Sequence, residues 1–265
     1  MNVLYAALIL GVLGLVFGVL LGFASKKFHI EVDSRIPKLR ECLPGANCGG
    51  CGYAGCDAYA EAMVMSGAKL NLCTVGGAKT AEDIGNIFGV AVDATKKMTA
   101  YVKCNGNCDS AKNRYDLKGV HDCITASLME DGGNKSCSYG CLGLESCVKV
   151  CEFDAIKVIN GVAKVDKEKC TNCGACIDIC PKGLIESVPY ASKVRVECNN
   201  VEIGRHVKEN CSNACIGCKL CERNCPHDAV HVLNNLALVN YDKCVNCEIC
   251  TKKCPTKSIK NVFVN

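Results

Sequence analysis

The chain has 265 residues, of which 26 are cysteine; tryptophan is absent and aromatic residues make up only 5%. An apolar content of 49% excludes a disordered chain, and a formal net charge of +4 is too small to indicate a nucleic-acid binder. A chain with so many cysteines and so few aromatic side chains is expected to rely on disulfides or metals for its stability.

The first segment predicts a transmembrane helix. Residues 3–24 carry no charge, and at about 1.5 Å per residue they would extend roughly 33 Å, enough to cross a hydrocarbon core of about 30 Å. A cleaved signal peptide is the alternative, which the missing cation before the run disfavours. Lys26 and Lys27 follow the run, so the positive-inside rule places the rest of the chain in the cytoplasm. We therefore expect residues 1–25 to form a single-pass anchor in the cytoplasmic membrane.

The next segment, residues 26–75, predicts an N-terminal [4Fe–4S] domain. Four cysteines follow one another at the spacing expected for a cluster: Cys48, Cys51, Cys56 and Cys73. Glycines between the first three allow the backbone to wrap closely around a cluster. Residues 57–66 predict a helix that Gly67 ends. A zinc knuckle is the alternative for this site.

Residues 76–129 are expected to be a linker with a short helix and possible extra cluster ligands. Val75, Gly76 and Gly77 indicate the start of a flexible segment.

The C-terminal half repeats the ligand run of bacterial ferredoxins. Cys170-x2-Cys173-x2-Cys176-x3-Cys180-Pro181 recurs from Cys244 to Pro255 and again from Cys215 to Pro226. In such a run the first three cysteines hold one cluster and the fourth ligates its neighbour. A shift of 74 residues superimposes most of the cysteines, which predicts two tandem ferredoxin-like modules, residues 130–190 and 191–265. Between the ligand runs, residues 155–165 and 229–239 predict β-hairpins.

Two clusters are predicted for each module. The first module is interrupted, because Leu144 stands where the second module has Cys218 and Glu152 stands where a proline is expected. Its expected ligand sets are Cys137, Cys141, Cys147 and Cys180, and Cys151, Cys170, Cys173 and Cys176. The sets expected for the second module are Cys215, Cys218, Cys221 and Cys254, and Cys225, Cys244, Cys247 and Cys250.

Six cysteines remain, and four of them suggest a sixth cluster. We assign Cys104, Cys123, Cys198 and Cys211 to it, with Cys108 as a rival for one position; reduced structural thiols are the alternative. Cys42 fits no spacing and is expected to be a small buried side chain. The fold class predicted is therefore a small metal-stabilised α+β protein with one transmembrane helix, a helical [4Fe–4S] domain and two bacterial-ferredoxin-like modules.

Several motifs are missing from the sequence. It has no Walker A motif, no G-x-G-x-x-G between a strand and a helix, and no catalytic triad or HExxH motif. We therefore expect no nucleotide site and no catalytic residues in this chain.

With these motifs in view, the chain resembles the B subunit of the Rnf electron-transport complex, of the longer type found in anaerobic bacteria. The resemblance covers nearly the whole chain and rests on the N-terminal span, the run Asn47-Cys-Gly-Gly-Cys-Gly-Tyr-Ala-Gly-Cys56, Cys73 and the tandem modules. It implies a subunit that takes electrons from soluble ferredoxin and relays them to membrane subunits, in a complex that reduces NAD⁺ and pumps Na⁺ or H⁺. It also implies that flavin and NAD sites lie on other subunits, and that this chain is part of a translocase without an active site of its own.

Two other functions are compatible with the ferredoxin modules. One is a membrane-anchored polyferredoxin subunit of a hydrogenase or quinone reductase, which would lack the site from Cys48 to Cys73. The other is a scaffold whose clusters are structural and do not accept electrons.

Overall fold

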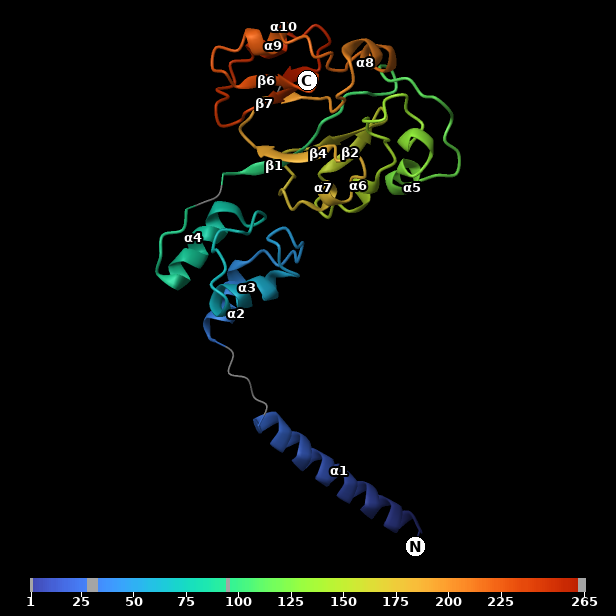
Figure 1. Cartoon of the computed structure of the whole chain (residues 1–265). Helices are drawn as coiled ribbons and strands as arrows, with labels where there is room; N and C mark the ends of the chain where they lie inside the picture. The colour runs from blue at the N-terminus through green and yellow to red at the C-terminus, as the bar shows by residue number, and fades with distance from the viewer. Residues whose placement is uncertain (1, 28–32, 94–95, 262–265) are drawn as a thin grey trace.

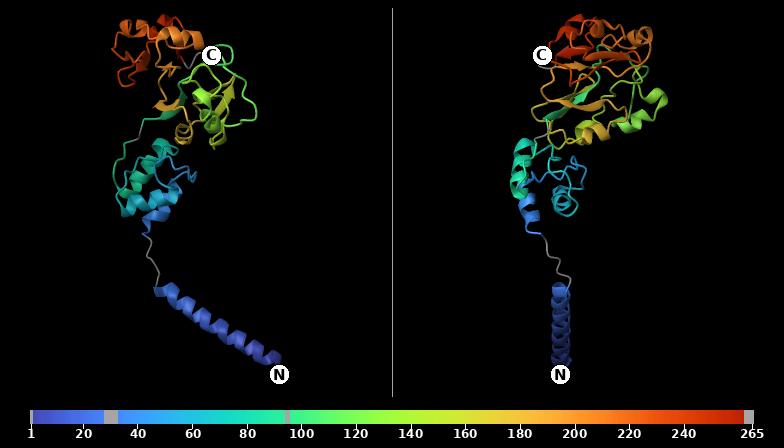
Figure 2. Two further views of the ribbon diagram at one scale, coloured as in Figure 1. Left: turned by 45° about the vertical axis from the view of Figure 1, so that its right-hand side comes forward. Right: turned by 60° about the vertical axis from the view of Figure 1, so that its left-hand side comes forward.

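The computed structural model describes residues 2–27, 33–93 and 96–261. Figure 1 shows a helix that projects away from the rest, then a small helical unit, and then two α+β modules that lie side by side. The same arrangement is seen from two other directions in Figure 2.

Helix α1 (Asn2–Lys27) corresponds to the segment predicted to span a membrane. Its large apolar side chains between Leu8 and Phe23 are exposed. Within the part of the chain that the structure describes, no helix reaches the length and apolarity that crossing a membrane requires. The transmembrane anchor thus stays a prediction.

The N-terminal unit consists of helices α2 (Arg35–Cys42), α3 (Cys56–Met65) and α4 (Gly77–Phe88). The three helices share one core, in which Leu39, Tyr59 and Ile84 are almost completely buried. Helix α3 matches the helix predicted for residues 57–66. The short helix expected in the linker is α4, which begins at Gly77, and α4 packs against α2 as part of the N-terminal unit.

Module one begins earlier than the sequence indicated, because part of the predicted linker is a strand. Strand β1 (Met98–Val102) pairs antiparallel with β4 (Ile185–Pro189), and β2 (Ile156–Ile159) pairs with β3 (Val162–Val165) as the predicted hairpin. Short helices lie between them: α5 (Cys123–Ser127), η1 (Glu130–Gly132), α6 (Ser146–Lys149) and α7 (Ala175–Asp178).

Module two repeats this plan. Strand β5 (Val194–Val196) pairs with β8 (Ile259–Asn261), and β6 (Val230–Leu233) forms the second predicted hairpin with β7 (Leu236–Val239). Its helices are α8 (Gly204–Asn210), α9 (Leu220–Arg223) and α10 (Ile249–Lys253). A sheet of only two strands covers only a small core. Five cysteines are among the buried residues of the module two core: Cys198, Cys211, Cys215, Cys221 and Cys250.

The ligand runs share one backbone feature. In each run, the residue immediately before the short helix has a positive φ, and these residues are Glu145, Gly174, Lys219 and Glu248. The left-handed turn lets consecutive cysteines of the run face the same space. Because Glu145 keeps this turn, module one retains the shape of the ferredoxin loop although Leu144 replaces a cysteine.

Candidate [4Fe–4S] centres

The structure gathers 24 of the 26 cysteines into six groups of four, which we number along the molecule from the α1 end. Site 1 contains Cys48, Cys51, Cys56 and Cys73. Site 2 contains Cys151, Cys170, Cys173 and Cys176. Site 3 contains Cys123, Cys141, Cys147 and Cys180. Site 4 contains Cys104, Cys137, Cys198 and Cys211. Site 5 contains Cys215, Cys218, Cys221 and Cys254, and site 6 contains Cys225, Cys244, Cys247 and Cys250.

Site 1 combines the loop before α3 with a distant cysteine, Cys73. The side-chain oxygen of Asn47 accepts a hydrogen bond from the Cys56 backbone N–H at 2.8 Å, which shapes the loop at the start of α3. The buried Tyr59 hydroxyl donates to the Lys69 carbonyl and accepts from the Leu72 N–H, at 2.6 and 3.2 Å. These two bonds hold the stretch of chain that ends at Cys73 against α3, so that the four predicted cysteines line one cavity.

Site 2 is formed by the local run in module one, closed by Cys151. The N–H of Ala100 in β1 donates to the Cys170 sulfur at 3.3 Å, so the strand that was predicted as linker covers this site. Site 2 also adjoins site 1. A Cβ on Gly50 would lie 2.7 Å from the Cys173 carbonyl oxygen, which shows how closely the two cysteine loops pack.

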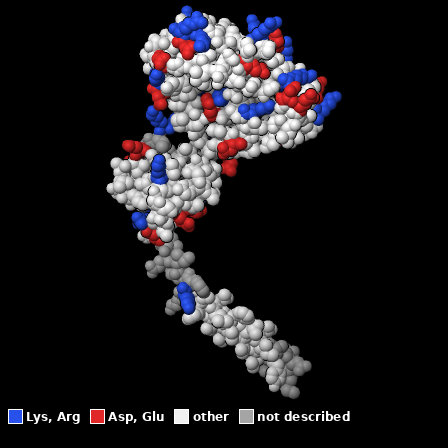
Figure 3. Space-filling model, viewed as in Figure 1, with Lys and Arg blue, Asp and Glu red and all other residues white. Residues whose placement is uncertain are grey.

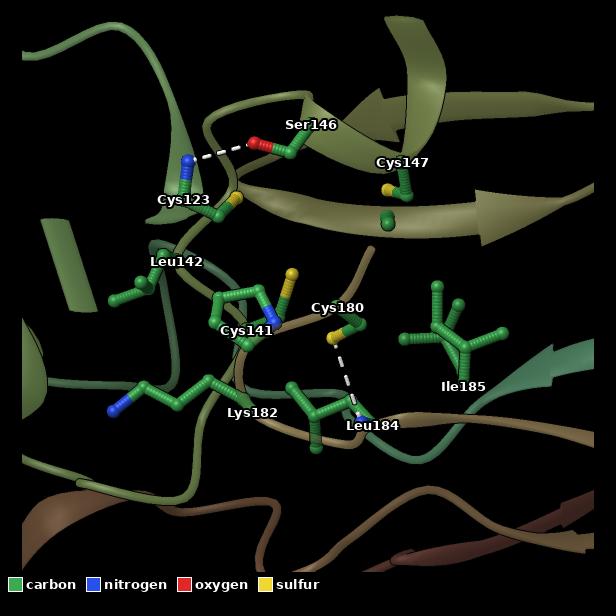
Figure 4. A pocket seen from close by; sticks show the side chains of 12 residues that line it. Cys123, Cys141, Leu142, Ser146, Cys147, Cys180, Lys182, Leu184 and Ile185 are labelled. Atoms are coloured by element: carbon green, nitrogen blue, oxygen red, sulfur yellow. Dashed lines mark hydrogen bonds between the residues drawn. The ribbon is translucent and has the colours of Figure 1, made fainter. Parts of the chain in front are cut away.

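Site 3 differs from the predicted set in one cysteine. Figure 4 shows the side chains of Cys123, Cys141, Cys147 and Cys180 around one cavity, with Leu142, Leu184 and Ile185 beside them. The structure places Cys123 rather than Cys137 beside Cys141, and Cys137 rather than Cys123 beside Cys104. The Ser146 side-chain oxygen accepts from the Cys123 N–H at 2.8 Å, which fixes Cys123 next to the loop that lacks a ligand at Leu144.

Site 4 lies where the two modules meet, and each module contributes two of its cysteines. Cys104 follows β1 and Cys198 follows β5, whereas Cys137 and Cys211 are related by the 74-residue shift. The Asn200 amide of module two donates to the Cys137 sulfur at 3.4 Å, which draws Cys137 away from site 3. A β-bridge between Ala111 and Cys211 closes the site from the module one side.

Sites 5 and 6 follow the predicted pattern of module two. In site 5, the charges of Cys215, Cys218 and Cys254 raise the pKa of Cys221. In site 6, those of Cys225, Cys244 and Cys247 raise the pKa of Cys250. The two sites are also adjacent, since Cys221 and Cys250 belong to one buried cluster and the charge of Cys221 helps to raise the pKa of Cys250.

The chemistry of these groups fits [4Fe–4S] clusters. Four thiols surround each of the cavities at sites 1 to 4, and backbone N–H groups donate to many of the sulfurs, a contact that tunes cluster potentials. Such bonds of 3.3 to 3.5 Å reach Cys73, Cys104, Cys151, Cys170, Cys180 and Cys225. The Ala155 and Ala229 donors occupy equivalent positions, four residues beyond Cys151 and Cys225.

Burial controls the acidity of these thiols. It is the largest influence that raises the pKa of Cys147, Cys176, Cys198 and Cys250 to about 12, and neighbouring cysteines add to the effect. Grouped thiols in such an environment resist ionisation by themselves. A bound metal core favours the thiolate, so that metal binding and proton release are coupled.

Two cysteines stand outside the six groups. Cys108 is exposed and Cys42 is partly buried in the N-terminal unit. Among the described residues, no three His, Cys, Asp or Glu side chains converge tightly enough to hold one metal ion. Thiolates that ligate a cubane surround a four-iron core and therefore stand wider apart than the ligands of one ion.

Known families account for three parts of the chain. Residues 43–75 match an Fe-S cluster family, residues 163–186 match a 4Fe-4S binding domain, and residues 214–259 match a 4Fe-4S dicluster domain. These matches and the fold define an iron–sulfur protein with several ferredoxin-type [4Fe–4S] sites.

Relatives narrow this class. The chain is 45% identical over 236 residues to the B subunit of the Na⁺-translocating ferredoxin:NAD⁺ oxidoreductase complex of Acetobacterium woodii, covering 89% of this chain and 71% of the relative. It is 42% identical to the B subunit of an ion-translocating oxidoreductase complex of Methanosarcina acetivorans, covering 89% of each. It is 41% identical to the B subunit of the proton-translocating ferredoxin:NAD⁺ oxidoreductase complex of Clostridium ljungdahlii, covering 90% of this chain and 84% of the relative. The chain belongs to this family, the B subunits of Rnf-type ion-translocating oxidoreductase complexes.

Proposed function

We propose that this chain is the electron-relaying subunit of an ion-translocating ferredoxin:NAD⁺ oxidoreductase complex, with a [4Fe–4S] cluster at each of the six sites. When bound, such clusters accept and release single electrons. The protein's part is to hold them in sequence, exclude water and set their potentials through burial and N–H···S bonds.

The observation that carries this proposal is the adjacency of successive sites. Site 1 adjoins site 2, because Gly50 packs against the Cys173 backbone. Site 2 adjoins site 3, because Cys147 of site 3 is close enough for its charge to raise the pKa of Cys176. The backbone N–H of Cys141 in site 3 donates to the Cys104 sulfur in site 4 at 3.4 Å.

The series continues through module two. Site 5 is close to both of its neighbours. The charge of Cys215 in site 5 raises the pKa of Cys198 in site 4, and that of Cys221 in site 5 raises the pKa of Cys250 in site 6. No site is isolated from its neighbours, so the arrangement supports a single linear path.

The ends of this path suggest a direction. Site 6 lies in module two, which Figure 1 shows farthest from α1. Site 1 lies in the N-terminal unit, which is the part next to α1. We propose that soluble ferredoxin donates electrons to module two and that site 1 delivers them to membrane subunits of the complex. On this proposal, those subunits carry the flavin and NAD sites and move the ion.

The same proposal assigns α1 to the membrane. Its exposed apolar side chains support a single-pass anchor, and Lys26 and Lys27 after the apolar run support a cytoplasmic position for the sites. We further propose that the functional units are α1, the N-terminal unit and the two modules, with the modules starting at β1 and β5.

The proposal is tested on the full-length chain, purified anaerobically in detergent. Analysis of iron and acid-labile sulfide should give about 24 iron atoms per chain, four for each cluster. Titration with reduced ferredoxin, followed by EPR, should then reduce these centres. Zinc in place of iron would refute the cluster assignment, and iron centres that ferredoxin does not reduce would refute the donor.

A further inference from the structure

Lys135 is a buried lysine in the wall of site 4. Its side chain is 6% exposed, and it lines the cavity together with Cys104, Cys137 and Cys211. Its ammonium donates to two backbone carbonyls, Gly106 O at 2.7 Å and Gly161 O at 3.1 Å.

The ammonium is buried without a carboxylate. Of the ion pairs formed by the described residues, none involves Lys135. Glu197 also lines site 4, but its carboxylate is paired with Lys164 at 3.1 Å and with Lys260 at 3.6 Å. A buried cation that meets only carbonyl dipoles is costly unless another negative charge stands nearby.

The thiolates of site 4, whose cavity Lys135 lines, can supply that charge. Gly106, whose carbonyl binds the ammonium, donates its own N–H to the Cys104 sulfur at 3.4 Å. A Cβ on the same glycine would lie 3.4 Å from the Cys211 sulfur. Gly106 therefore lies between the Lys135 ammonium and two sulfurs, and these two sulfurs belong to different modules.

The repeat shows that this lysine is not required by the module fold. The 74-residue shift that relates Cys137 to Cys211 takes Lys135 to Glu209. Glu209 is exposed on α8, where it faces Arg205 at 3.7 Å. Because the equivalent position of module two carries a surface carboxylate, the shared plan of the modules does not account for a buried cation at position 135.

We propose that Lys135 sets the reduction potential of the site 4 cluster, holding it above the value that burial alone would give. This inference rests on the proposed function, since it requires a cluster at site 4. An oxidised [4Fe–4S] core with four thiolates is a dianion, and one-electron reduction makes it a trianion. A fixed positive charge at short range in a medium of low dielectric constant favours the more negative state. Lys135 thus eases transfer of the electron between the modules.

Three substitutions separate charge from packing. Lys135→Gln removes the charge and keeps N–H donors for the two carbonyls, Lys135→Met removes both, and Lys135→Arg keeps the charge. Lys149→Met is the matched control, because the Lys149 ammonium also donates to a carbonyl, His121 O at 2.9 Å, but at an exposed position. The site 4 signal is identified as the EPR signal that Cys198→Ser removes.

The measurement is an EPR-monitored redox titration of the full-length holoprotein, with iron content determined for every variant. In K135Q and K135M the site 4 midpoint potential should fall by about 59 mV. For a one-electron couple, this lowers the ratio of reduced to oxidised cluster about tenfold at a fixed solution potential. K135R and K149M should match the unsubstituted chain.

Three results would overturn the inference. One is an unchanged site 4 potential in K135Q at full iron content. Another is a fall in K135R as large as that in K135Q, since packing would then be the cause. The third is loss of the site 4 cluster in K135Q but not in K135R, which would give Lys135 a role in retaining the cluster. Failure of the proposed function is separate, because the unsubstituted chain would itself lack six reducible clusters.

Discussion

A single residue change explains the unusual ligand set at site 3. Leu144 occupies the position at which module two has Cys218, yet Glu145 after it keeps the positive φ of the ferredoxin loop. The backbone at position 144 therefore still has the shape that presents a cysteine. Cys123, held by Ser146, approaches the cavity from α5 and takes the fourth position.

This arrangement predicts that Cys123 is a cluster ligand and Cys108 is not. Cys123→Ala should lose the site 3 cluster, lowering the iron content by about four atoms per chain or leaving a three-iron centre. Cys108→Ala, at an exposed cysteine outside the six groups, should keep all of its iron. Iron analysis together with EPR of the reduced protein distinguishes the two. Equal iron in both variants would contradict the assignment.

The retained loop shape gives a rescue experiment. Because position 144 is already presented by the left-handed turn at Glu145, Leu144→Cys in the Cys123→Ala background should restore the missing iron. The rescue is expected to return the site 3 EPR signal as well. A double variant that stays as iron-poor as Cys123→Ala would show that the loop does not have the geometry described.

At the scale of loops and elements, the contact between the N-terminal unit and module one depends on Gly50. A side chain there would meet the Cys173 backbone, and the Thr74 hydroxyl donates to the Asn172 carbonyl at 3.4 Å across the same contact. Because the obstacle is backbone, it cannot turn aside as a flexible side chain would. The small residue lets sites 1 and 2 approach.

We therefore expect Gly50→Ala to separate these two sites without removing either cluster. Electron transfer from site 2 to site 1 should slow several-fold, because the loops must move apart to admit the methyl group. Ala54→Val is the control, since it enlarges an exposed residue of the same loop. Freeze-quench EPR after mixing with a reductant measures the rate at which site 1 is reduced. An unchanged rate in Gly50→Ala would show that the contact does not govern transfer.

The sequence predicted the elements whose determinants are local. The run from Cys170 to Cys180 lies within one loop, and the hairpin turns at Asn160 and Asn234 are adjacent to their strands, so spacing alone indicated them. The strand β1 was assigned to a linker, because its partner β4 is more than 80 residues away and its five residues carry no alternation strong enough to reveal it. Pairing over such distances is decided by packing that a local pattern does not contain.

The exchange of Cys123 and Cys137 has the same origin. Both cysteines precede the loop of site 3, and sequence distance favours Cys137. The contact that decides between them is the bond from Asn200 of module two to the Cys137 sulfur, which depends on how the modules meet. The repeat offered one usable signal, since Cys137 is the counterpart of Cys211 and two equivalent residues suit a site shared by both modules.

At the scale of the whole molecule, the clusters are expected to hold the fold together. Each sheet that the structure describes has two strands, and cysteines stand among the buried residues in the cores of both modules. A two-stranded sheet without a large apolar face is marginal in water, and thiols gathered at such sites repel one another when ionised.

Removing iron should therefore unfold the modules. After treatment with a chelator and an oxidant, far-ultraviolet circular dichroism should show loss of strand signal and of cooperative thermal unfolding, as in other domains whose metal supplies the folding energy. Reconstitution with iron and sulfide under reducing conditions should restore both, which controls for irreversible damage. A chain that keeps its cooperative transition without iron would show that packing alone is sufficient.

The charge on the outer surface bears on how the donor is recognised. Figure 3 shows Lys and Arg side chains gathered on the end of the molecule away from α1, interspersed with acidic ones. Lys252 and Lys253 end helix α10, both are exposed, and they lie between Cys250 of site 6 and Cys254 of site 5. A donor with an acidic surface would be guided to the end of α10, which lies between ligands of these two sites.

Reversing these charges should slow reduction by ferredoxin without altering the clusters. For Lys252→Glu with Lys253→Glu, we expect the second-order rate to fall about tenfold at low ionic strength, within the range attributed to electrostatic steering. The difference should shrink as salt shortens the screening length to about 3 Å at 1 M. Lys38→Glu, at an exposed lysine of the N-terminal unit, is the control for net charge. Stopped-flow absorbance at several salt concentrations gives the rates; if the Lys38 variant slows equally, ferredoxin is not guided to module two, and the direction proposed for the relay loses its support.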